Sequence, residues 1–142
     1  MRALIDTCVI VDALQSREPF KKDAEAVFLC SANKSFDAYI TAKSVTDIYY
    51  LTHKITHSDS DTRKILTNLF VLFEPLDTNG LDCRKAVSSE IPDYEDAVMV
   101  ETAIRSEMDC IVTRNVRDYS KSTVPVYQLP EFLSMICFSK EE

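Results

Sequence analysis

Short continuous hydrophobic runs alternate along this chain with longer segments in which hydrophobic residues recur at helical spacing. The short runs are typical of buried strands in a parallel sheet. They lie at residues 2–5, 37–41, 73–77, 109–113 and 124–129. The segments with helical spacing lie at residues 8–16, 21–33, 42–56, 58–73, 78–90, 92–107 and 130–138. This alternation predicts an α/β fold in which helices cover both faces of a parallel sheet.

Local signals place several of the expected helix ends. Thr41 stands where an N-cap is expected, so the helix after the second strand should begin at residue 42. Pro92 and Pro130 fall at or near helix starts, where proline is tolerated. No repeat, low-complexity tract or linker interrupts the pattern, and 142 residues fit one domain over 1–142. The acidic pair 141–142 is expected to be a frayed end.

Composition excludes some ways of handling phosphate. The chain is 46% hydrophobic, which suffices for a core, but its single glycine excludes both a GxGxxG loop and a Walker-type loop. The net charge of −7 argues against a nucleic-acid binder, unless the acids hold metal ions that reverse the local field. Such a charge would also suit a basic partner. Lys43, Lys54 and Arg63 are scattered cations that could line a groove, but they form no basic patch in the sequence.

The five cysteines are odd in number and form no CxxC motif. Most lie in apolar runs, so we expect buried, reduced thiols and hence a cytoplasmic protein. No segment approaches the length of a membrane span, and no secretory leader is recognisable.

Asp6 follows the first apolar run directly, which points its carboxylate at the rim of the sheet where α/β proteins place their sites. A carboxylate so close to a buried strand is costly unless it is paired or binds a metal. Asp6 or Thr7 could instead cap the following helix. On local evidence the two interpretations are about equally supported.

Two predicted helices carry further acids. Asp47 lies near the edge of an apolar helix face, in mid-helix, where aspartate is a poor helix former. Asp93 and Asp96 are three residues apart in a first helical turn, so they face a similar side. Acids in that turn are also favoured by the helix dipole alone. Glu95 is expected to point elsewhere into solvent, and Asp12 is also expected to be solvated.

A polar segment follows the fourth strand. Thr113 and Asn115 could contact a metal ion, its bound water or a phosphate. Arg114 and Arg117 could donate forked hydrogen bonds to a phosphate backbone. An ordinary polar loop explains the segment equally well when it is taken alone.

Carboxylates that meet at one sheet edge repel one another, and a hard cation such as Mg²⁺ or Mn²⁺ relieves that repulsion. We therefore favour metal-assisted phosphodiester chemistry, and the candidate metal ligands are Asp6, Asp47, Asp93 and Asp96. A zinc site at His53 and His57, spaced i and i+4, lacks a third ligand, so we expect an ordinary helix end there. Tyr49 is expected in the core.

Taken in order, these motifs resemble the PIN-domain nucleases over essentially the whole chain. The motifs are the strand ending in Asp6-Thr7, the helical Asp47, the D-x-x-D-A start at 93–97 and the TRN-x-x-D-Y segment at 113–119. In size the chain is most similar to the toxin ribonucleases of bacterial toxin–antitoxin pairs.

The resemblance implies a three-layer α/β/α sandwich with a central, mainly parallel five-stranded sheet. It also implies a Mg²⁺- or Mn²⁺-dependent endoribonuclease acting on RNA, a homodimer, and an antitoxin partner where the operon supplies one. Asp6 and Asp96 match the first and third acids of the family. Asp47 matches the second, which is commonly glutamate, and Asn115 stands where many members carry a fourth aspartate. Asp93 or Asp118 could supply the missing charge, and Thr113, Arg114 and Asn115 would orient water or phosphate.

Other functions compete with this one. A phosphotransferase of the haloacid-dehalogenase type needs Asp-x-Asp, but Cys8 stands in the second place. A receiver-like signalling domain needs an acidic pair before the tip of strand one, which is absent, although Asp77 does end the middle strand. A PIN-like fold that has lost catalysis and serves as a binding module is the third alternative, because Asp47 and Asn115 depart from the family pattern.

Overall fold

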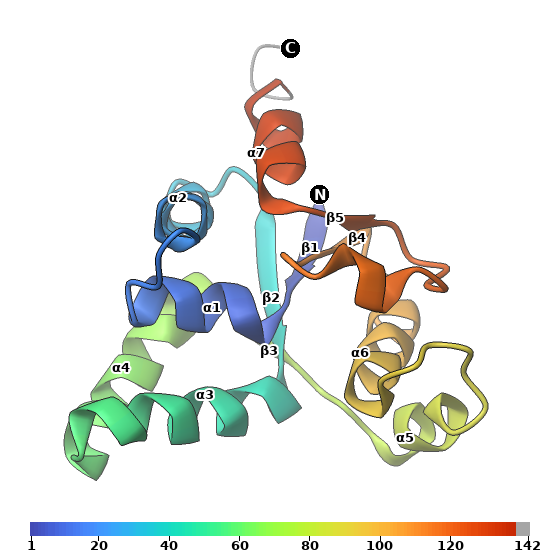
Figure 1. The fold of residues 1–142 in the computed structure, drawn as a ribbon, viewed down its shortest axis with the longest axis horizontal. Helices are drawn as coiled ribbons and strands as arrows, with labels where there is room; N and C mark the ends of the chain where they lie inside the picture. The colour runs from blue at the N-terminus through green and yellow to red at the C-terminus, as the bar shows by residue number, and fades with distance from the viewer. Residues whose placement is uncertain (139–142) are drawn as a thin grey trace.

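The computed structural model describes residues 1–138 as one parallel sheet enclosed by helices (Figure 1). The strand order in the sheet is β3-β2-β1-β4-β5, and all neighbours are parallel. The strands are β1 (Arg2–Ile5), β2 (Asp37–Thr41), β3 (Glu74–Leu76), β4 (Cys110–Val112) and β5 (Val126–Tyr127). The predicted five-stranded parallel sheet is confirmed. The acidic pair 141–142 lies outside the described residues.

Helices cover both faces of the sheet and complete the predicted three-layer sandwich (Figure 1). They are α1 (Thr7–Leu14), α2 (Lys21–Ala32), α3 (Ala42–Thr56), α4 (Asp59–Leu72), α5 (Gly80–Ala86), α6 (Tyr94–Arg105), the 3₁₀ helix η1 (Val116–Tyr119) and α7 (Leu129–Phe138). Successive side chains of β1 point to opposite faces. Ala3 and Ile5 therefore join the core under α1 to α4 and α7, while Leu4 joins the core under α5 and α6.

Most predicted boundaries hold, and the exceptions have local causes. α3 begins after Thr41, whose side chain accepts a hydrogen bond from the Ser44 amide, as the capping preference predicted. The expected strand at 124–129 is reduced to two residues, because Pro125 has no N–H for the ladder and contributes only its carbonyl, to Ile111. The helix expected at 78–90 is shorter in the structure, where only α5 is helical. The 3₁₀ helix η1 was not predicted.

The position of α6 is set by a buried ion pair with α5. Asp82 is 1% exposed and accepts hydrogen bonds from Arg105 Nε at 2.9 Å and Nη2 at 3.0 Å. It also forms a capping box with Asn79 at the start of α5 and accepts a hydrogen bond from Thr102. Burial alone would raise the pKa of Asp82, but Arg105 and the Asn79 amide outweigh it and hold this pKa below its ordinary value. The carboxylate is therefore ionised at neutral pH.

No helix in the described part of the chain is both long enough and apolar enough to span a bilayer. The cysteines form no disulfide within residues 1–138. The expectation of buried thiols holds only for Cys110, because Cys8, Cys30 and Cys83 are partly exposed and Cys137 is exposed. Partial burial still raises the pKa of the Cys8 thiol to about 11. This thiol is therefore protonated at neutral pH and unsuited to act as a nucleophile.

Candidate active site

The topology of the sheet creates a crevice at the carboxyl ends of β1 and β4. The chain runs outward from β1 to β2 and β3 on one side, and β4 and β5 lie on the other side. This is the point where the strand order reverses, and open α/β sheets bind ligands there. Asp6 directly follows β1, and Thr113 directly follows β4.

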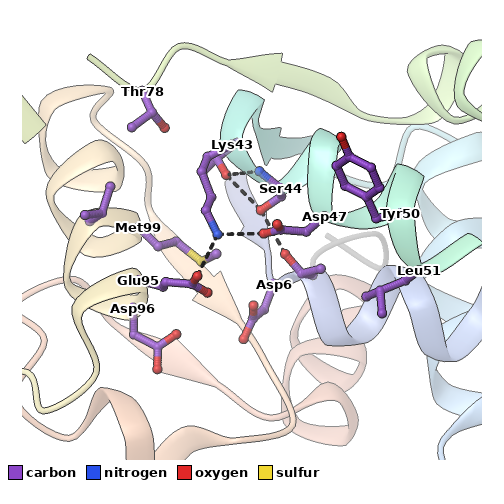
Figure 2. Close-up of a pocket in the computed structure, with 13 residues that line it drawn as sticks. Asp6, Lys43, Ser44, Asp47, Tyr50, Leu51, Thr78, Glu95, Asp96 and Met99 are labelled. Atoms are coloured by element: carbon purple, nitrogen blue, oxygen red, sulfur yellow. Dashed lines mark hydrogen bonds and ion pairs between the residues drawn. The ribbon is translucent and has the colours of Figure 1, made fainter. Parts of the chain in front are cut away.

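A pocket of about 390 Å³ opens at this edge (Figure 2). The carboxylates among its lining residues come from the end of β1, where α1 begins, and from α3 and α6. They belong to Asp6, Asp47, Glu95 and Asp96. The structure thus brings Asp6, Asp47 and Asp96 to one cavity, whereas Asp93 and Asn115 do not line it.

Asp6 occupies the N-cap position of α1, but its side chain makes no capping hydrogen bond. Its Oδ2 atom instead accepts hydrogen bonds from the hydroxyls of Thr113, at 2.8 Å, and Tyr119, at 3.2 Å. All three side chains are buried. The carboxylate is therefore held toward β4 and η1 rather than toward its own helix, so helix capping does not explain it.

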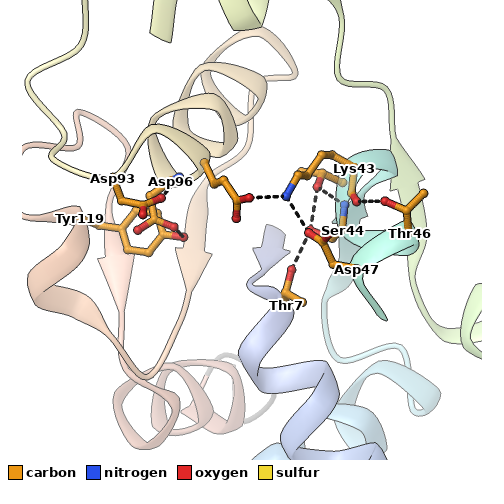
Figure 3. Close-up of polar contacts among 10 residues, drawn as sticks. Thr7, Lys43, Ser44, Thr46, Asp47, Asp93, Asp96 and Tyr119 are labelled. Atoms are coloured by element: carbon orange, nitrogen blue, oxygen red, sulfur yellow. Dashed lines mark hydrogen bonds and ion pairs between the residues drawn. The ribbon is translucent and has the colours of Figure 1, made fainter. Parts of the chain in front are cut away.

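Tyr119 joins Asp6 to Asp96. Its hydroxyl also lies 3.0 Å from Asp96 Oδ1, yet a phenol has only one proton to donate (Figure 3). Burial raises the pKa of Asp96 to about 6 against the hydrogen bond from Tyr119, and the charges of Asp6, Asp93 and Asp118 add to the rise. Burial and the two carboxylates also raise the pKa of Tyr119. The motif containing Tyr119 was recognised in the sequence, but nothing local indicated that its hydroxyl lies between two acids.

Asp93 serves as the N-cap of α6. Its Oδ1 atom accepts a hydrogen bond from the Asp96 amide at 3.0 Å. The first turn of α6 is therefore fixed, and with it the direction of the Asp96 side chain. Pro92 precedes this cap and does not enter the first turn. Aspartate is a preferred N-cap residue, and this capping role explains why Asp93 stands at this position.

Lys43 lies between Asp47 and Glu95 (Figures 2 and 3). Its Nζ atom is 2.7 Å from Asp47 Oδ2 and 3.0 Å from Glu95 Oε1. Partial burial opposes the charged ammonium, but the hydrogen bonds to the two carboxylates outweigh it and raise the pKa of Lys43. The expectation that Glu95 points away is wrong, because this contact turns the exposed side chain toward the pocket. Lys43 had been seen only as one of several scattered cations.

A buried hydroxyl network joins the starts of α1 and α3. Thr7 donates to Ser44 Oγ at 2.8 Å, and Ser44 in turn lies 2.8 Å from the Thr41 hydroxyl (Figure 3). The start of α1, which Asp6 precedes, is thereby held against the start of α3, which carries Asp47 in its second turn. Ser44 was not singled out in the sequence, because its partner Thr7 lies 37 residues away.

The segment after β4 divides between two directions. Thr113 faces Asp6, and its hydroxyl also accepts a hydrogen bond from the Asn115 amide. Arg114 faces away from the pocket: its Nε donates to Asp12 Oδ2 at 2.8 Å, and its guanidinium stacks on the Phe20 ring at 4.2 Å. The expectation that Asp12 is solvated is wrong, since it is 1% exposed and paired with this arginine.

The remaining candidates form no second centre. His57 ends α3 as its C-cap, as expected for a helix end, and His53 stacks on Tyr49. Tyr49 is half-buried and donates a hydrogen bond to Asp59, so it is not a core residue. Within residues 1–138, no three or more His, Cys, Asp and Glu side chains are close enough together to hold a metal ion by themselves.

Asp6 and Asp96 nevertheless fit a hard divalent cation. They are buried or partly buried carboxylates that share one hydroxyl proton, so part of their mutual repulsion is unrelieved. Mg²⁺ binds through one or two carboxylates and keeps several waters, so a larger protein cage is not required.

Comparisons with known proteins agree with this geometry. The PIN-domain family model matches residues 2–117, and the chain belongs to this family of nucleases, which generally use divalent metals. A search of curated proteins gave no match. Membership of the PIN-domain family removes the phosphotransferase and receiver alternatives.

Several solved structures have the same fold. A toxin–antitoxin complex from Klebsiella pneumoniae has a TM-score of 0.65 at 20% identity, covering 89% of this chain and 97% of that one. VapBC2 from Rickettsia felis, bound to a promoter DNA fragment, has a TM-score of 0.65 at 14% identity, with coverages of 90% and 98%. FitAcB from Neisseria gonorrhoeae has a TM-score of 0.65 at 19% identity, with coverages of 89% and 97%.

Replacing Tyr119 with phenylalanine tests whether its hydroxyl orients the two carboxylates. We expect a loss of about 1 kcal/mol in unfolding free energy, the usual size for one hydrogen bond. We also expect roughly tenfold weaker Mn²⁺ binding, as for other groups that orient metal ligands. Denaturant unfolding and calorimetry measure the two effects. Unchanged Mn²⁺ affinity in the folded variant would contradict the orienting role.

Proposed function

We propose that this protein is an endoribonuclease that depends on Mg²⁺ or Mn²⁺. The observation that carries the proposal is the meeting of Asp6 and Asp96 on one buried hydroxyl at the point where the strand order reverses. Membership of a nuclease family supports phosphodiester hydrolysis, and the resemblance to toxin ribonucleases supports RNA as the substrate.

Each residue of the pocket has a role in this proposal. Asp6 and Asp96 hold the cation, while Tyr119 and Thr113 fix the direction of their carboxylates. When bound, the cation polarises the phosphoryl oxygen and lowers the pKa of a water molecule. Asp47 adds negative charge on the α3 side, and Asp93 fixes the turn that carries Asp96.

The surroundings of Thr113 and Arg114 modify the expected substrate contacts. Thr113 acts through Asp6 rather than on phosphate directly, since its hydroxyl donates to that carboxylate. Arg114 would have to leave Asp12 to reach an RNA strand in the pocket. Asn115 is exposed and adjoins Thr113, and its proposed role is to contact RNA that enters from solvent.

An antitoxin is the proposed protein partner, and cytoplasm the proposed location. The neighbouring structures include toxin–antitoxin complexes, and the net charge of −7 complements a basic partner. A homodimer is the proposed oligomeric state, which light scattering coupled to size-exclusion chromatography would test.

A cleavage assay with purified protein tests the proposed activity. We expect a labelled RNA to be cut in Mn²⁺ or Mg²⁺ and to remain intact when EDTA is added, because the proposed mechanism uses the cation to activate water. DNA of the same sequence serves as the comparison substrate. RNA cleavage that persists in EDTA would overturn the metal-dependent mechanism. The Asp96→Asn variant, purified in the same way, serves as the control for contaminating nuclease.

A second candidate function is a PIN fold that binds RNA or protein without cleaving. The observation that favours it is the ion pair of Asp47 with Lys43, which leaves one expected metal ligand already occupied. The same assay separates the two, since a degenerate pocket would bind Mn²⁺ weakly and would not cut RNA in any metal.

A further inference from the structure

We propose that Lys43 takes the place of a second metal ion, so that the pocket binds one divalent cation at Asp6 and Asp96 while the Lys43 ammonium donates a hydrogen bond to a phosphate on the other side. This inference rests on the proposed nuclease function and concerns how the pocket is charged. It assigns a role to a residue that the function itself does not require.

The position of the ammonium supports the assignment. Its two carboxylate partners come from opposite sides of the pocket, Asp47 from α3 and Glu95 from α6 (Figure 2). In a two-metal site, a second divalent ion would contact acids from two elements in the same way. Lys43 makes this contact from its own helix, at distances of 2.7 and 3.0 Å.

The charges of the pocket divide into two halves. One half holds Asp6 and Asp96, which share the Tyr119 hydroxyl and form no ion pair with a lysine, arginine or histidine within residues 1–138. The other half holds Asp47 and Glu95, which are both paired with Lys43. Among the described lining residues Lys43 is the single lysine or arginine. The second half therefore retains one uncompensated negative charge and the first half two, so the first half has the greater need for a divalent cation.

The ammonium also has a free donor for substrate. A lysine carries three N–H groups, and two are directed at the carboxylates of Asp47 and Glu95. Its side chain is 41% exposed, so the third donor can meet a phosphate oxygen that enters from solvent. A point charge of this kind suits a phosphate whose geometry changes during reaction.

Calorimetric titration of metal-free protein with Mn²⁺ measures the number of ions bound. We expect one ion for the wild type and two for Lys43→Gln, because removal of the ammonium frees Asp47 and Glu95. Lys43→Arg keeps the cation and should bind one ion. Lys64→Gln, an equal charge change at an exposed position of α4, should also bind one.

The rate of RNA cleavage at low Mn²⁺ gives an independent reading. The slope of log rate against log Mn²⁺ concentration should rise from one in the wild type to two in Lys43→Gln. Circular dichroism establishes folding of each variant. Lys43→Met, which keeps the apolar stem, repeats the test if the glutamine variant does not fold.

The outcomes distinguish this inference from the proposed function. Two ions on a wild type that cleaves RNA would overturn the inference and leave the nuclease intact. One ion on both Lys43→Gln and Lys43→Met would do the same. No binding to any variant, together with no cleavage, would overturn both.

Discussion

Replacing Asp96 with asparagine is expected to reduce metal-dependent RNA cleavage at least about a hundredfold. Asparagine keeps the size and can still accept the hydrogen bond from Tyr119, but it removes one of the two charges that would hold the cation. Loss of several kcal/mol of charge stabilisation by the metal corresponds to such a factor, since about 1.4 kcal/mol is tenfold in rate. Single-turnover cleavage in saturating Mn²⁺ measures the effect.

The same substitution is expected to stabilise the protein without metal. The pKa of Asp96 rises from 3.8 to about 6 on folding, so the ionised carboxylate is disfavoured in the folded state. Below pH ~4 the group is protonated both folded and unfolded, and it adds no cost. The cost grows as the pH rises to about 6 and is complete above it. Asparagine never ionises, so its advantage should be present at pH 7.5 and vanish near pH 4.

We expect the gain at pH 7.5 to be about 1–2 kcal/mol. One pKa unit corresponds to roughly 1.4 kcal/mol, and solvent screening of a partly exposed side chain reduces the full value. Thermal unfolding in EDTA should show a Tm higher by roughly 5 °C. Mn²⁺ should stabilise the wild type but not the variant. Full activity in the folded variant would contradict a role for Asp96 in metal binding. A lower Tm at pH 7.5 would contradict the raised pKa of Asp96.

Replacing Asp82 with alanine is expected to cause the largest loss of stability, about 3 kcal/mol. The substitution removes both hydrogen bonds from Arg105, the capping box with Asn79 and the contact with Thr102. Breaking a buried ion pair by removing one partner costs roughly 3–5 kcal/mol. Arg105 is 34% exposed and regains some hydration, which places the expected loss at the lower end.

Urea unfolding measures this loss, and Asp61→Ala provides the control. Asp61 also lies in the first turn of a helix but is exposed, so its replacement should change stability by less than about 0.5 kcal/mol. The loss at Asp82 should persist at pH 7 and shrink in acid, because the low pKa of this carboxylate makes its contribution disappear only as the pH falls through the folded value. Equal stability of the two variants would contradict the anchoring of α6 by Asp82.

The fold was predictable where its signals are local. Thr41 marks the start of α3 because a threonine before an amphipathic segment satisfies the helix amides. The alternation of apolar runs and helices indicated a parallel sheet, although the strand order β3-β2-β1-β4-β5 came only from the structure. β5 was overestimated because Pro125 interrupts its ladder.

The candidate site was predictable only in part, because its contacts are long-range. Asp6, Asp47 and Asp96 were expected to meet at one edge of the sheet, and all three line one pocket in the structure. Asp12 was taken for a surface residue because its partner Arg114 lies 102 residues later. Lys43 has one local and one distant partner: Asp47 is four residues away on the same helix, whereas Glu95 comes from α6. Local patterns contain no information on such pairs.

The pocket is tested most directly by the anomalous diffraction of Mn²⁺ in crystals of the wild-type protein. We predict a manganese peak bound by carboxylate oxygens of Asp6 and Asp96, at about the 2.1 Å typical of small hard cations. The peak should be absent from the Asp96→Asn variant soaked under the same conditions. Manganese bound elsewhere, or an empty pocket in a protein that cleaves RNA, would contradict the proposed active site.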